Sequence, residues 1–481
     1  MKKLLFVLIF VPLSVFSQNC SCEDDFKWLK NTIEENDAGF QYVIDIKGQS
    51  SYDKHNEDFT KKVKSISKQN ECTDVLKQWL LFFRSGHLSL NTVQNIAEQD
   101  KQQVINTYKN WEKYAISDAD LKKYMSKLKQ PAGLEGIWRS DPYTIAIVKK
   151  DNQYIGFVVQ GDELYWQKNQ IKLRLKPAVN GEGYEGVYYM KDHSEQRITK
   201  TKLVGNNYMT LNWLNFKRIS PQFTDSKLIA DYVDLITSPV PVAKQISDKT
   251  FLLRIPSFSE TKKRSIDSLI AQYHDKIAST DNLIIDIRNN GGGSDGSFQK
   301  LLPFIYTNPL RSIGVSYLST PLNNKRMEDF MVSKDFSASD KEWARNGLKK
   351  LNANIGKFVN LQDSDSVEVS TMDSIYVYPK KVAILVNENN GSTAEQFLLT
   401  AKQSAKVKLF GTTTAGVLDI SNMYFVESPC KTMRLGYSLS KSRRIPDMAI
   451  DNKGIQPDYY IDSSIPDQEW INFTEQTLLG K

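Results

Sequence analysis

A serine between a predicted strand and a predicted helix is the first candidate for chemistry in this sequence. Ser392 follows the apolar run 382–386 and a loop rich in asparagine and glycine, and residues 393–402 have a helical pattern. A serine in this place can present its hydroxyl at the edge of a sheet, where helix amides can stabilise negative charge. The pattern fits a nucleophile, but Ser392 and Glu395 also have the spacing of a capping box, in which the serine only caps the helix.

A nucleophilic serine needs a base that takes its proton, and the chain has only four histidines. Three of them, His55, His193 and His274, lie in polar, charged segments that are typical of a solvated surface. His87 lies at the end of an apolar helical segment, directly after a glycine. It is therefore the candidate base, although a hydrogen-bonded structural histidine would have the same surroundings.

Three successive glycines at 291–293 follow a second apolar run at 282–287. Glycine lets the backbone approach a ligand closely, and free amides at a helix start can bind an oxyanion. With Gly296 the loop formally satisfies a dinucleotide-binding motif. Its context excludes that function, because the first glycine does not follow the strand directly and residues 311–325 contain no acidic residue. Taken alone, the loop is explained by a tight turn.

The elements around these loops alternate between strand and helix from about residue 224. Such alternation predicts an α/β domain with a largely parallel sheet, in which ligand and catalytic groups gather at the strand ends. We expect strands at 251–255, 282–287 and 382–386 and helices at 262–277, 296–306 and 393–402.

Two further domains precede this one, and 481 residues are enough for about three. Residues 18–130 have apolar residues at three- and four-residue spacing, which predicts a helical N-terminal domain. Residues 131–222 contain short alternating runs separated by turns, which predicts a small antiparallel β domain. The α/β domain then occupies residues 223–481.

The first 17 residues have the pattern of a secretory signal peptide. Lys2 and Lys3 precede an apolar stretch at 4–16, and Ser17 ends a plausible cleavage site. The stretch is too short to span a bilayer, and no later segment is apolar enough. We therefore expect an exported protein, periplasmic or extracellular, without a membrane span.

The cysteines indicate disulfides but no metal site, and the net charge does not indicate a nucleic-acid partner. In an oxidising compartment Cys72 can pair with either Cys20 or Cys22, and the sequence does not decide between them. A metal site is not expected, because the Cys20-x-Cys22 pair has no second close pair. A net charge of +7 over this length is too small to argue for nucleic acid.

Together these segments resemble the C-terminal processing, or tail-specific, serine protease family. The glycine loop within 283–294, the serine loop within 383–396 and the segments 409–416 and 454–458 occur in the order of that family. The resemblance covers roughly residues 224–465 and the short segment around His87. It implies a core of the crotonase and Clp-protease type, a peptide or protein substrate, no cofactor, and a Ser392 that is both nucleophile and cap.

The base distinguishes two branches of this family. The Ser-Lys branch has a lysine 25 residues after the nucleophile, where this chain has Val417, which cannot accept a proton. The chain is therefore more similar to the branch of the tricorn core and the retinoid-binding repeats, which uses a histidine. Gly86-His87 matches that pattern, although the aspartate often found two residues before the histidine is Ser85 here.

The resemblance also implies roles for four further residues. Asp451 and Glu395 are alternative candidates for the carboxylate that orients the histidine, and the sequence does not decide between them. The backbone amides of Gly292 and Thr393 would form the oxyanion hole. Many relatives carry a PDZ domain, but residues 131–222 lack its recognisable carboxylate-binding loop, so recognition of C-termini is left open.

The expected function is that of a secreted serine endopeptidase, with substrate and oligomeric state left open. A catalytically inactive peptide- or ligand-binding protein of the same fold is the alternative, which Val417 and Ser85 favour. A third possibility is that the β domain binds glycans or a partner through Trp138, Trp166 and Trp213, although core packing is the commoner explanation for such residues.

Overall fold

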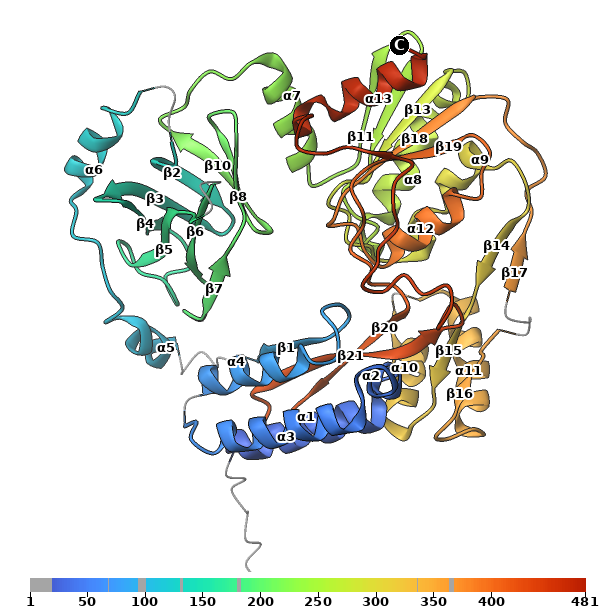
Figure 1. Ribbon diagram of the computed structural model, residues 1–481, viewed down its shortest axis with the longest axis horizontal. Coiled ribbons are helices and arrows are strands. Elements are labelled where there is room, and N and C mark those ends of the chain that lie inside the picture. Colours follow the sequence, from blue (N-terminus) through green and yellow to red (C-terminus); the bar gives the residue numbers. More distant parts are fainter. Residues whose placement is uncertain are drawn as a thin grey trace, which may run out of the picture. The chain divides into compact units, whose positions relative to one another are not determined.

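The computed structural model describes residues 20–67, 69–93, 101–129, 133–179, 183–334, 336–362 and 367–481. The signal peptide predicted at 1–17 lies outside these residues. By its internal contacts the chain divides into two compact units, whose segments can be found in Figure 1 by the colours of their residue numbers. The first combines the described residues before 94 with residues 318–359 and 422–440, and the second contains the remaining segments. The boundaries predicted at 130 and 222 stay predictions.

The helices of the first unit come from two distant parts of the chain. The first of them begins with a capping box, in which Oγ of Ser21 accepts a hydrogen bond from the amide of Asp24, and its buried face carries Leu29 and Ile33. The N-terminal helices are α1 (Cys22–Asn36), α2 (Phe40–Lys47), α3 (Gln49–Val63) and α4 (Gln69–Leu80), and a later helical hairpin consists of α10 (Pro321–Val332) and α11 (Ala338–Asn352).

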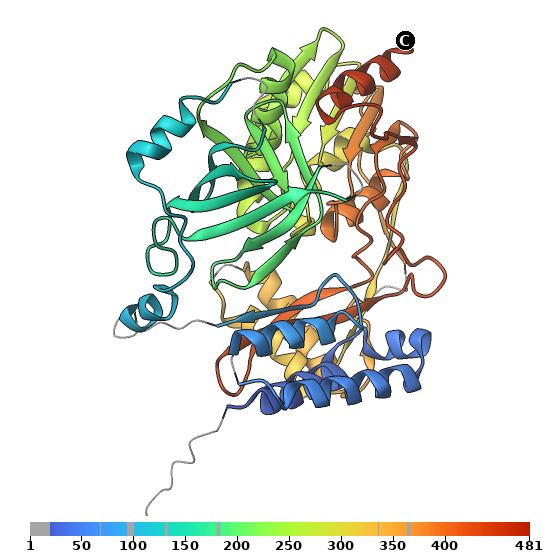
Figure 2. The ribbon, with the colours of Figure 1, turned by 60° about the vertical axis from the view of Figure 1, so that its left-hand side comes forward.

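A five-stranded sheet pairs strands that are far apart in the sequence. β1 (Ser89–Thr92) runs antiparallel to β21 (Met433–Ser442), with Leu90 opposite Leu435, and Figure 2 shows the two side by side. The order continues through β15 (Val315–Leu318) to β16 (Phe358–Val359), and β20 (Ile420–Glu427) also pairs with β21. The segment that follows His87 is therefore anchored on a C-terminal strand.

Two disulfides join elements of the first unit. Cys22 pairs with Cys72, which is one of the two pairings that the sequence left open. Cys20 pairs with Cys430, a partner that the sequence analysis did not consider. The second bond ties the start of the described chain to the turn between β20 and β21.

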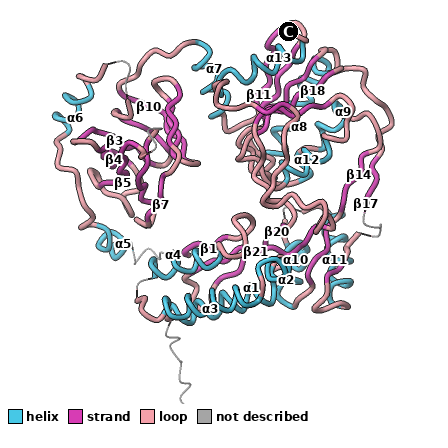
Figure 3. The backbone as a smooth tube through the Cα atoms, viewed as in Figure 1, coloured by secondary structure: helices cyan, strands magenta, loops and turns pink. Residues whose placement is uncertain are grey.

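A nine-stranded antiparallel sheet forms the β module of the second unit (Figure 3). Trp138 and Trp166 are completely buried in its core, and only Trp213, which is 58% exposed, reaches the surface. The idea of a binding face made by all three is therefore wrong. The strands, in the order β7-β6-β5-β4-β3-β2-β10-β9-β8, are β7 (Glu195–Ile198), β6 (Tyr184–Tyr189), β5 (Ile171–Pro177), β4 (Gln153–Gln160), β3 (Tyr143–Lys150), β2 (Gly136–Ser140), β10 (Leu214–Ser220), β9 (Tyr208–Leu211) and β8 (Thr201–Val204), and α5 (Lys101–Tyr108) and α6 (Asp118–Met125) precede them.

The α/β core of the second unit has a six-stranded sheet with helices on both faces. Successive side chains of a strand point to opposite faces, so Ile285 packs with α8 and α12, and its neighbour Ile284 packs with α13. The sheet order is β11 (Val242–Ser247), β12 (Thr250–Arg254), β13 (Asn282–Asp286), β18 (Lys381–Val386), β19 (Val407–Gly411) and β22 (Tyr459–Tyr460), parallel except for β11. The helices are α7 (Lys227–Thr237), α8 (Glu260–Ile277), α9 (Leu302–Ile305), α12 (Thr393–Ala401) and α13 (Trp470–Leu479).

The fold class predicted from the sequence is confirmed, with one correction in the core. The helix expected at 296–306 is instead two short 3-10 turns, η2 (Asp295–Ser297) and η3 (Gln299–Leu301), followed by the single turn of α9. In a separate ribbon, β14 (Leu310–Ile313) pairs with β17 (Val367–Ser370). No helix among the described residues is long and apolar enough to cross a membrane.

Candidate active site

Two neighbouring parallel strands of the core end in loops of matching sequence. β13 and β18 lie in register with Asp286 opposite Leu385, so the loops that follow them leave the same edge of the sheet. Both loops contain Asn-Asn-Gly, at 289–291 and at 389–391. The structure therefore brings together the glycine loop and the serine loop, as the sequence pattern predicts for parallel strand ends.

Buried asparagines join the two loops. Nδ2 of Asn390 donates to the carbonyl oxygens of Ile287 at 2.5 Å and of Asn290 at 3.1 Å. Oδ1 of Asn290 in turn accepts from the amides of Gly292 at 3.0 Å and of Phe258 at 3.2 Å. Both asparagines are fully buried, and a buried amide with partners on both its oxygen and its nitrogen fixes the backbone that it contacts.

Ser392 stands directly before α12 in a strained backbone conformation. Its φ of 55° and ψ of −126° differ from the extended conformation of an ordinary N-cap such as Ser226, with φ −62° and ψ 154°. Its side chain makes no capping hydrogen bond to α12, so the predicted capping box with Glu395 is wrong. A non-glycine residue at positive φ costs about 1–3 kcal/mol, and such strain is concentrated at functional sites.

The glycine loop lies directly against Ser392. A Cβ atom added to Gly292, whose φ is 102°, would lie 2.8 Å from Cβ of Ser392 and 2.7 Å from the carbonyl oxygen of Gly391. Only glycine fits that space. Oγ1 of Thr393 donates to the carbonyl oxygen of Gly293 at 3.1 Å, which ties the first turn of α12 to the same loop.

The amides around Ser392 differ in their availability for an oxyanion. The amide of Gly292, one of the two predicted donors, already donates to Oδ1 of Asn290 at 3.0 Å. Across the described part of the chain, no acceptor is found for the amide of Thr393, the other predicted donor, or for that of Gly293. The glycine loop therefore offers the Gly293 amide more readily than that of Gly292.

Glu395 binds the segment 414–417, which packs against the loop of Ser392. Its Oε1 accepts from Oγ1 of Thr414 at 2.5 Å and from the amide of Gly416 at 2.7 Å, and its Oε2 accepts from the amide of Val417 at 2.9 Å. Burial raises the pKa of this carboxyl, and the hydrogen bonds oppose that rise. A Cβ on Gly391 would lie 2.6 Å from Cγ2 of Val417. Glu395 thus holds Val417 against the residue before Ser392.

Asp451, the other candidate orienter, also binds backbone amides. Its Oδ1 accepts from the amides of Leu418 and Asp419, both at 2.6 Å, and its Oδ2 accepts from the amide of Ile420 at 3.2 Å. Burial, together with the nearby charge of Asp419, raises the pKa of Asp451. Asp419 itself is fully buried and accepts from Nε of Arg444 at 2.9 Å. Sequence reasoning missed Asp419 because a lone aspartate outside any motif gives no signal.

His87 belongs to the first unit, and Ser392 belongs to the second. The backbone of His87 has a φ of 52°, which is again unusual for a residue with a side chain. Its carbonyl oxygen accepts from Nη2 of Arg84 at 3.3 Å and from Oγ of Ser438 at 3.2 Å. The role of His87 as the base stays a prediction.

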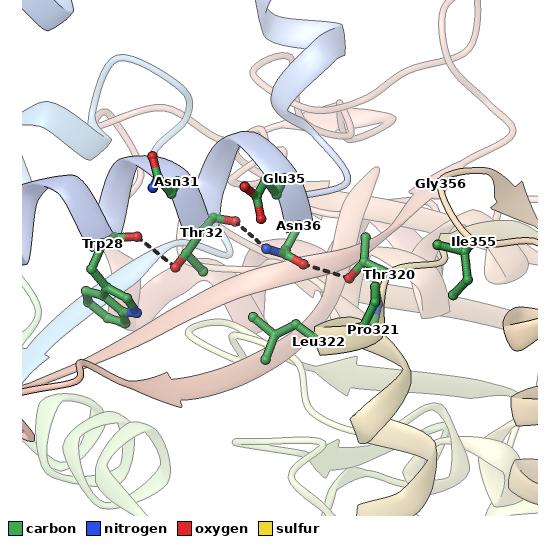
Figure 4. Close-up of a pocket in the computed structure, with 10 residues that line it drawn as sticks. All are labelled: Trp28, Asn31, Thr32, Glu35, Asn36, Thr320, Pro321, Leu322, Ile355 and Gly356. Atoms are coloured by element: carbon green, nitrogen blue, oxygen red, sulfur yellow. Dashed lines mark hydrogen bonds between the residues drawn. The ribbon is translucent and has the colours of Figure 1, made fainter.

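A pocket in the first unit contains none of the predicted catalytic residues. It has a volume of about 530 Å³ and lies between α1 and the start of α10 (Figure 4). Within it, Oγ1 of Thr320 donates to Oδ1 of Asn36 at 2.6 Å. Its lining consists of Trp28, Asn31, Thr32, Glu35, Asn36, Thr320, Pro321, Leu322, Ile355 and Gly356. Among the described residues, no group of three or more histidine, cysteine or acidic side chains is placed to hold a metal ion.

The sequence profile of peptidase family S41 matches residues 249–461. This range includes the glycine loop, Ser392, Glu395 and Asp451, and it excludes His87. No curated protein matches the chain significantly in sequence.

Solved structures have a similar fold at low sequence identity. Mature CPAF complexed with lactacystin is 13% identical, with 95% of this chain and 97% of that chain covered and a TM-score of 0.54. Mature CPAF alone is also 13% identical, covers 95% and 96%, and has a TM-score of 0.51. A putative peptidase from Parabacteroides merdae is 13% identical, covers 96% and 98%, and has a TM-score of 0.43. For the two CPAF structures, whose TM-scores exceed 0.5, the likeness concerns the fold alone.

Proposed function

We propose that the chain is a serine endopeptidase, because residues 249–461 match the sequence profile of peptidase family S41. Oγ of Ser392 attacks the carbonyl carbon of a peptide bond while His87 takes its proton and then delivers it to the leaving amine. Water then hydrolyses the acyl-enzyme, with His87 as the base again. The amide of Thr393, together with an amide of the glycine loop, stabilises the oxyanion. The mechanism uses no metal or organic cofactor.

The backbone of Ser392 is the observation that carries this proposal. A serine that merely capped α12 would take an extended conformation and bond to the helix amides, whereas Ser392 has a φ of 55° and makes no such bond. Strain of this kind is expected to be retained where it presents a reacting group. Gly292 lies directly against Ser392, and the amides of Gly293 and Thr393 have no acceptor among the described residues, so the two loops can supply donors for an oxyanion.

Labelling with a fluorophosphonate probe, combined with cleavage profiling of a mixed peptide library, tests the proposal. We expect residues 18–481 to be labelled at Ser392 and to cut peptides, and Ser392→Ala to do neither. Ser226→Ala is the matched control, because Ser226 is an ordinary N-cap of α7, and it should keep both properties. A wild-type chain that is neither labelled nor active, but binds peptides, would instead support the non-catalytic alternative.

We also propose that the protein is exported from the cytoplasm and that its signal peptide, residues 1–17, is cleaved off. The pairing of all four cysteines supports it, because disulfides persist in oxidising compartments. We expect the mature chain to begin at Gln18 and to fractionate outside the cytoplasm. N-terminal sequencing of the protein in each cell fraction tests this. Protein that still begins at residue 1 in every fraction would contradict export.

A further inference from the structure

The short loop that carries His87 is held in one conformation by buried polar groups. His87 has a φ of 52° and lies two residues before β1. A left-handed conformation is uncommon for a residue with a side chain and persists where contacts impose it. The contacts that impose it here can be followed within the first unit.

Arg84 holds the loop from one side. Its Nη1 donates to Oδ1 of Asp37 at 2.7 Å and its Nη2 donates to Oδ2 at 2.5 Å, which is a two-pronged pair. The same guanidinium donates through Nε to the carbonyl oxygen of Gly86 at 3.1 Å and through Nη2 to that of His87 at 3.3 Å. The two charged side chains are 7% and 1% exposed, so they are removed from water as a matched pair.

Ser438 closes the network from the other side. Its amide donates to Oδ2 of Asp37 at 3.1 Å, and its Oγ donates to the carbonyl oxygen of His87 at 3.2 Å. Nη2 of Arg84 donates to the same Oγ at 3.1 Å. Ser438 lies on β21 and is fully buried. Arg84 and Ser438 therefore bind the carbonyl oxygen of His87 directly, and Asp37 binds both of them.

We propose that Arg84, Asp37 and Ser438 are positioning residues for the imidazole of His87. The inference rests on the proposed function, in which His87 is the base. None of the three needs to touch the substrate. Arg84 and Ser438 act through the carbonyl oxygens of Gly86 and His87, and Asp37 acts by binding Arg84 and Ser438. By fixing the backbone of His87 they fix the origin and direction of its side chain, and small misplacements of a catalytic group are costly.

Arg84→Lys and Ser438→Ala separate this role from bulk stability. Lysine keeps the charge but loses the planar fork that binds Asp37 and both carbonyl oxygens. Alanine removes only the hydroxyl. We expect kcat to fall about 10- to 100-fold in each variant, with KM within about twofold. Ser438→Thr, which keeps a hydroxyl, should restore most of the loss. Arg345→Lys, at an exposed ion pair on α11, is the control and should leave kcat unchanged.

A spectroscopic readout keeps the test independent of turnover. With four histidines in the chain, the imidazole NMR signal of His87 can be assigned by its loss in His87→Gln. We expect this signal to shift or broaden in Arg84→Lys and Ser438→Ala, while circular dichroism shows that both are folded and the His274 signal stays in place. An inactive wild type with these shifts would refute the proposed function alone. An active wild type whose two variants keep kcat and the His87 signal would overturn the positioning role.

Discussion

Asp419 and Asp451 bind each other's backbone. The amide of Asp419 donates to Oδ1 of Asp451 at 2.6 Å, and the amide of Asp451 donates to Oδ2 of Asp419 at 2.9 Å. Nε of Arg444 donates to the remaining oxygen of Asp419 at 2.9 Å, which compensates the charge of this fully buried carboxylate. This reciprocal clamp fastens the segment that leads into β20 to the segment before Gly454.

The clamp predicts that Asp451→Asn destabilises the fold. An amide can accept with only one of its two positions, so at least one of the three backbone amides that Asp451 binds would face an NH₂ group. We expect the free energy of unfolding in urea to fall by about 1–3 kcal/mol. Asp447→Asn, at an exposed position of the same segment, should change it by less than about 0.5 kcal/mol. A variant with wild-type stability but a large loss of kcat would instead indicate that Asp451 orients the base.

Glu395→Gln tests the support under the serine loop. The carboxylate accepts three hydrogen bonds from the segment 414–417, and glutamine would place donors against at least one of them. We expect kcat to fall, since Val417 would no longer be held against Gly391, and stability to fall by about 1–3 kcal/mol. Glu388→Gln, at an exposed position of the same loop, is the control. Unchanged kinetics and stability in Glu395→Gln would refute this role.

Asn390→Ala should uncouple the serine loop from the glycine loop. The substitution leaves the carbonyl oxygens of Ile287 and Asn290 without the donor that Asn390 supplies. We expect a loss of about 1–3 kcal/mol in unfolding free energy and a lower labelling rate by a fluorophosphonate. Asn389→Ala is the comparison, because Nδ2 of Asn389 also donates to the glycine loop, to Oδ1 of Asn289 at 2.9 Å, but at an exposed position. Loss of this exposed hydrogen bond should change both quantities much less than Asn390→Ala does. Equal effects of the two substitutions would contradict the role of Asn390 in joining the two loops.

The α/β core was predictable because its strands and loops are marked by patterns of neighbouring residues in the sequence. Strands buried on both faces read as continuous apolar runs, such as the one around Ile284 and Ile285, and parallel strands bring successive loops to one edge. The strain at Ser392 was not predictable, since a capping box and a strained serine have the same sequence. The Asn-Asn-Gly repeat at 289–291 and 389–391 was a signal that sequence reasoning passed over.

The make-up of the first unit was out of reach for a different reason. The pairing of Leu90 with Leu435 and the bond between Cys20 and Cys430 join segments several hundred residues apart, and no local pattern encodes such a meeting. The burial of Trp166 depends likewise on strands from across the β module. Local patterns identify elements, and packing decides their partners.

His193 is buried in the β module in a form that favours its neutral state. Its ring stacks on Trp166 at 3.8 Å and on Tyr108 at 4.2 Å. Its Nε2 lies 2.8 Å from the carbonyl oxygen of Tyr165, so this nitrogen carries the proton, and its buried Nδ1 has no partner among the described residues. Burial, with a smaller effect of the nearby Lys172, lowers the pKa of His193 to about 4.

This lowered pKa predicts a loss of stability on acidification. Between about pH 6.5 and pH 4 the unfolded chain binds a proton at His193 that the folded chain does not, so stability falls as the pH falls through this window, by about 3 kcal/mol in all. Burial lowers the pKa of Lys172 to about 6, so the loss of stability linked to Lys172 begins near pH 10.5 and ends near pH 6, in the upper part of this window. His193→Phe keeps the stacking and should remove most of the acid-induced loss, measured by urea unfolding at about pH 7 and about pH 4.5 with tryptophan fluorescence. His274→Gln, at a partly exposed histidine, should leave it in place. The same loss in His193→Phe as in the wild type would show that other groups govern the acid response.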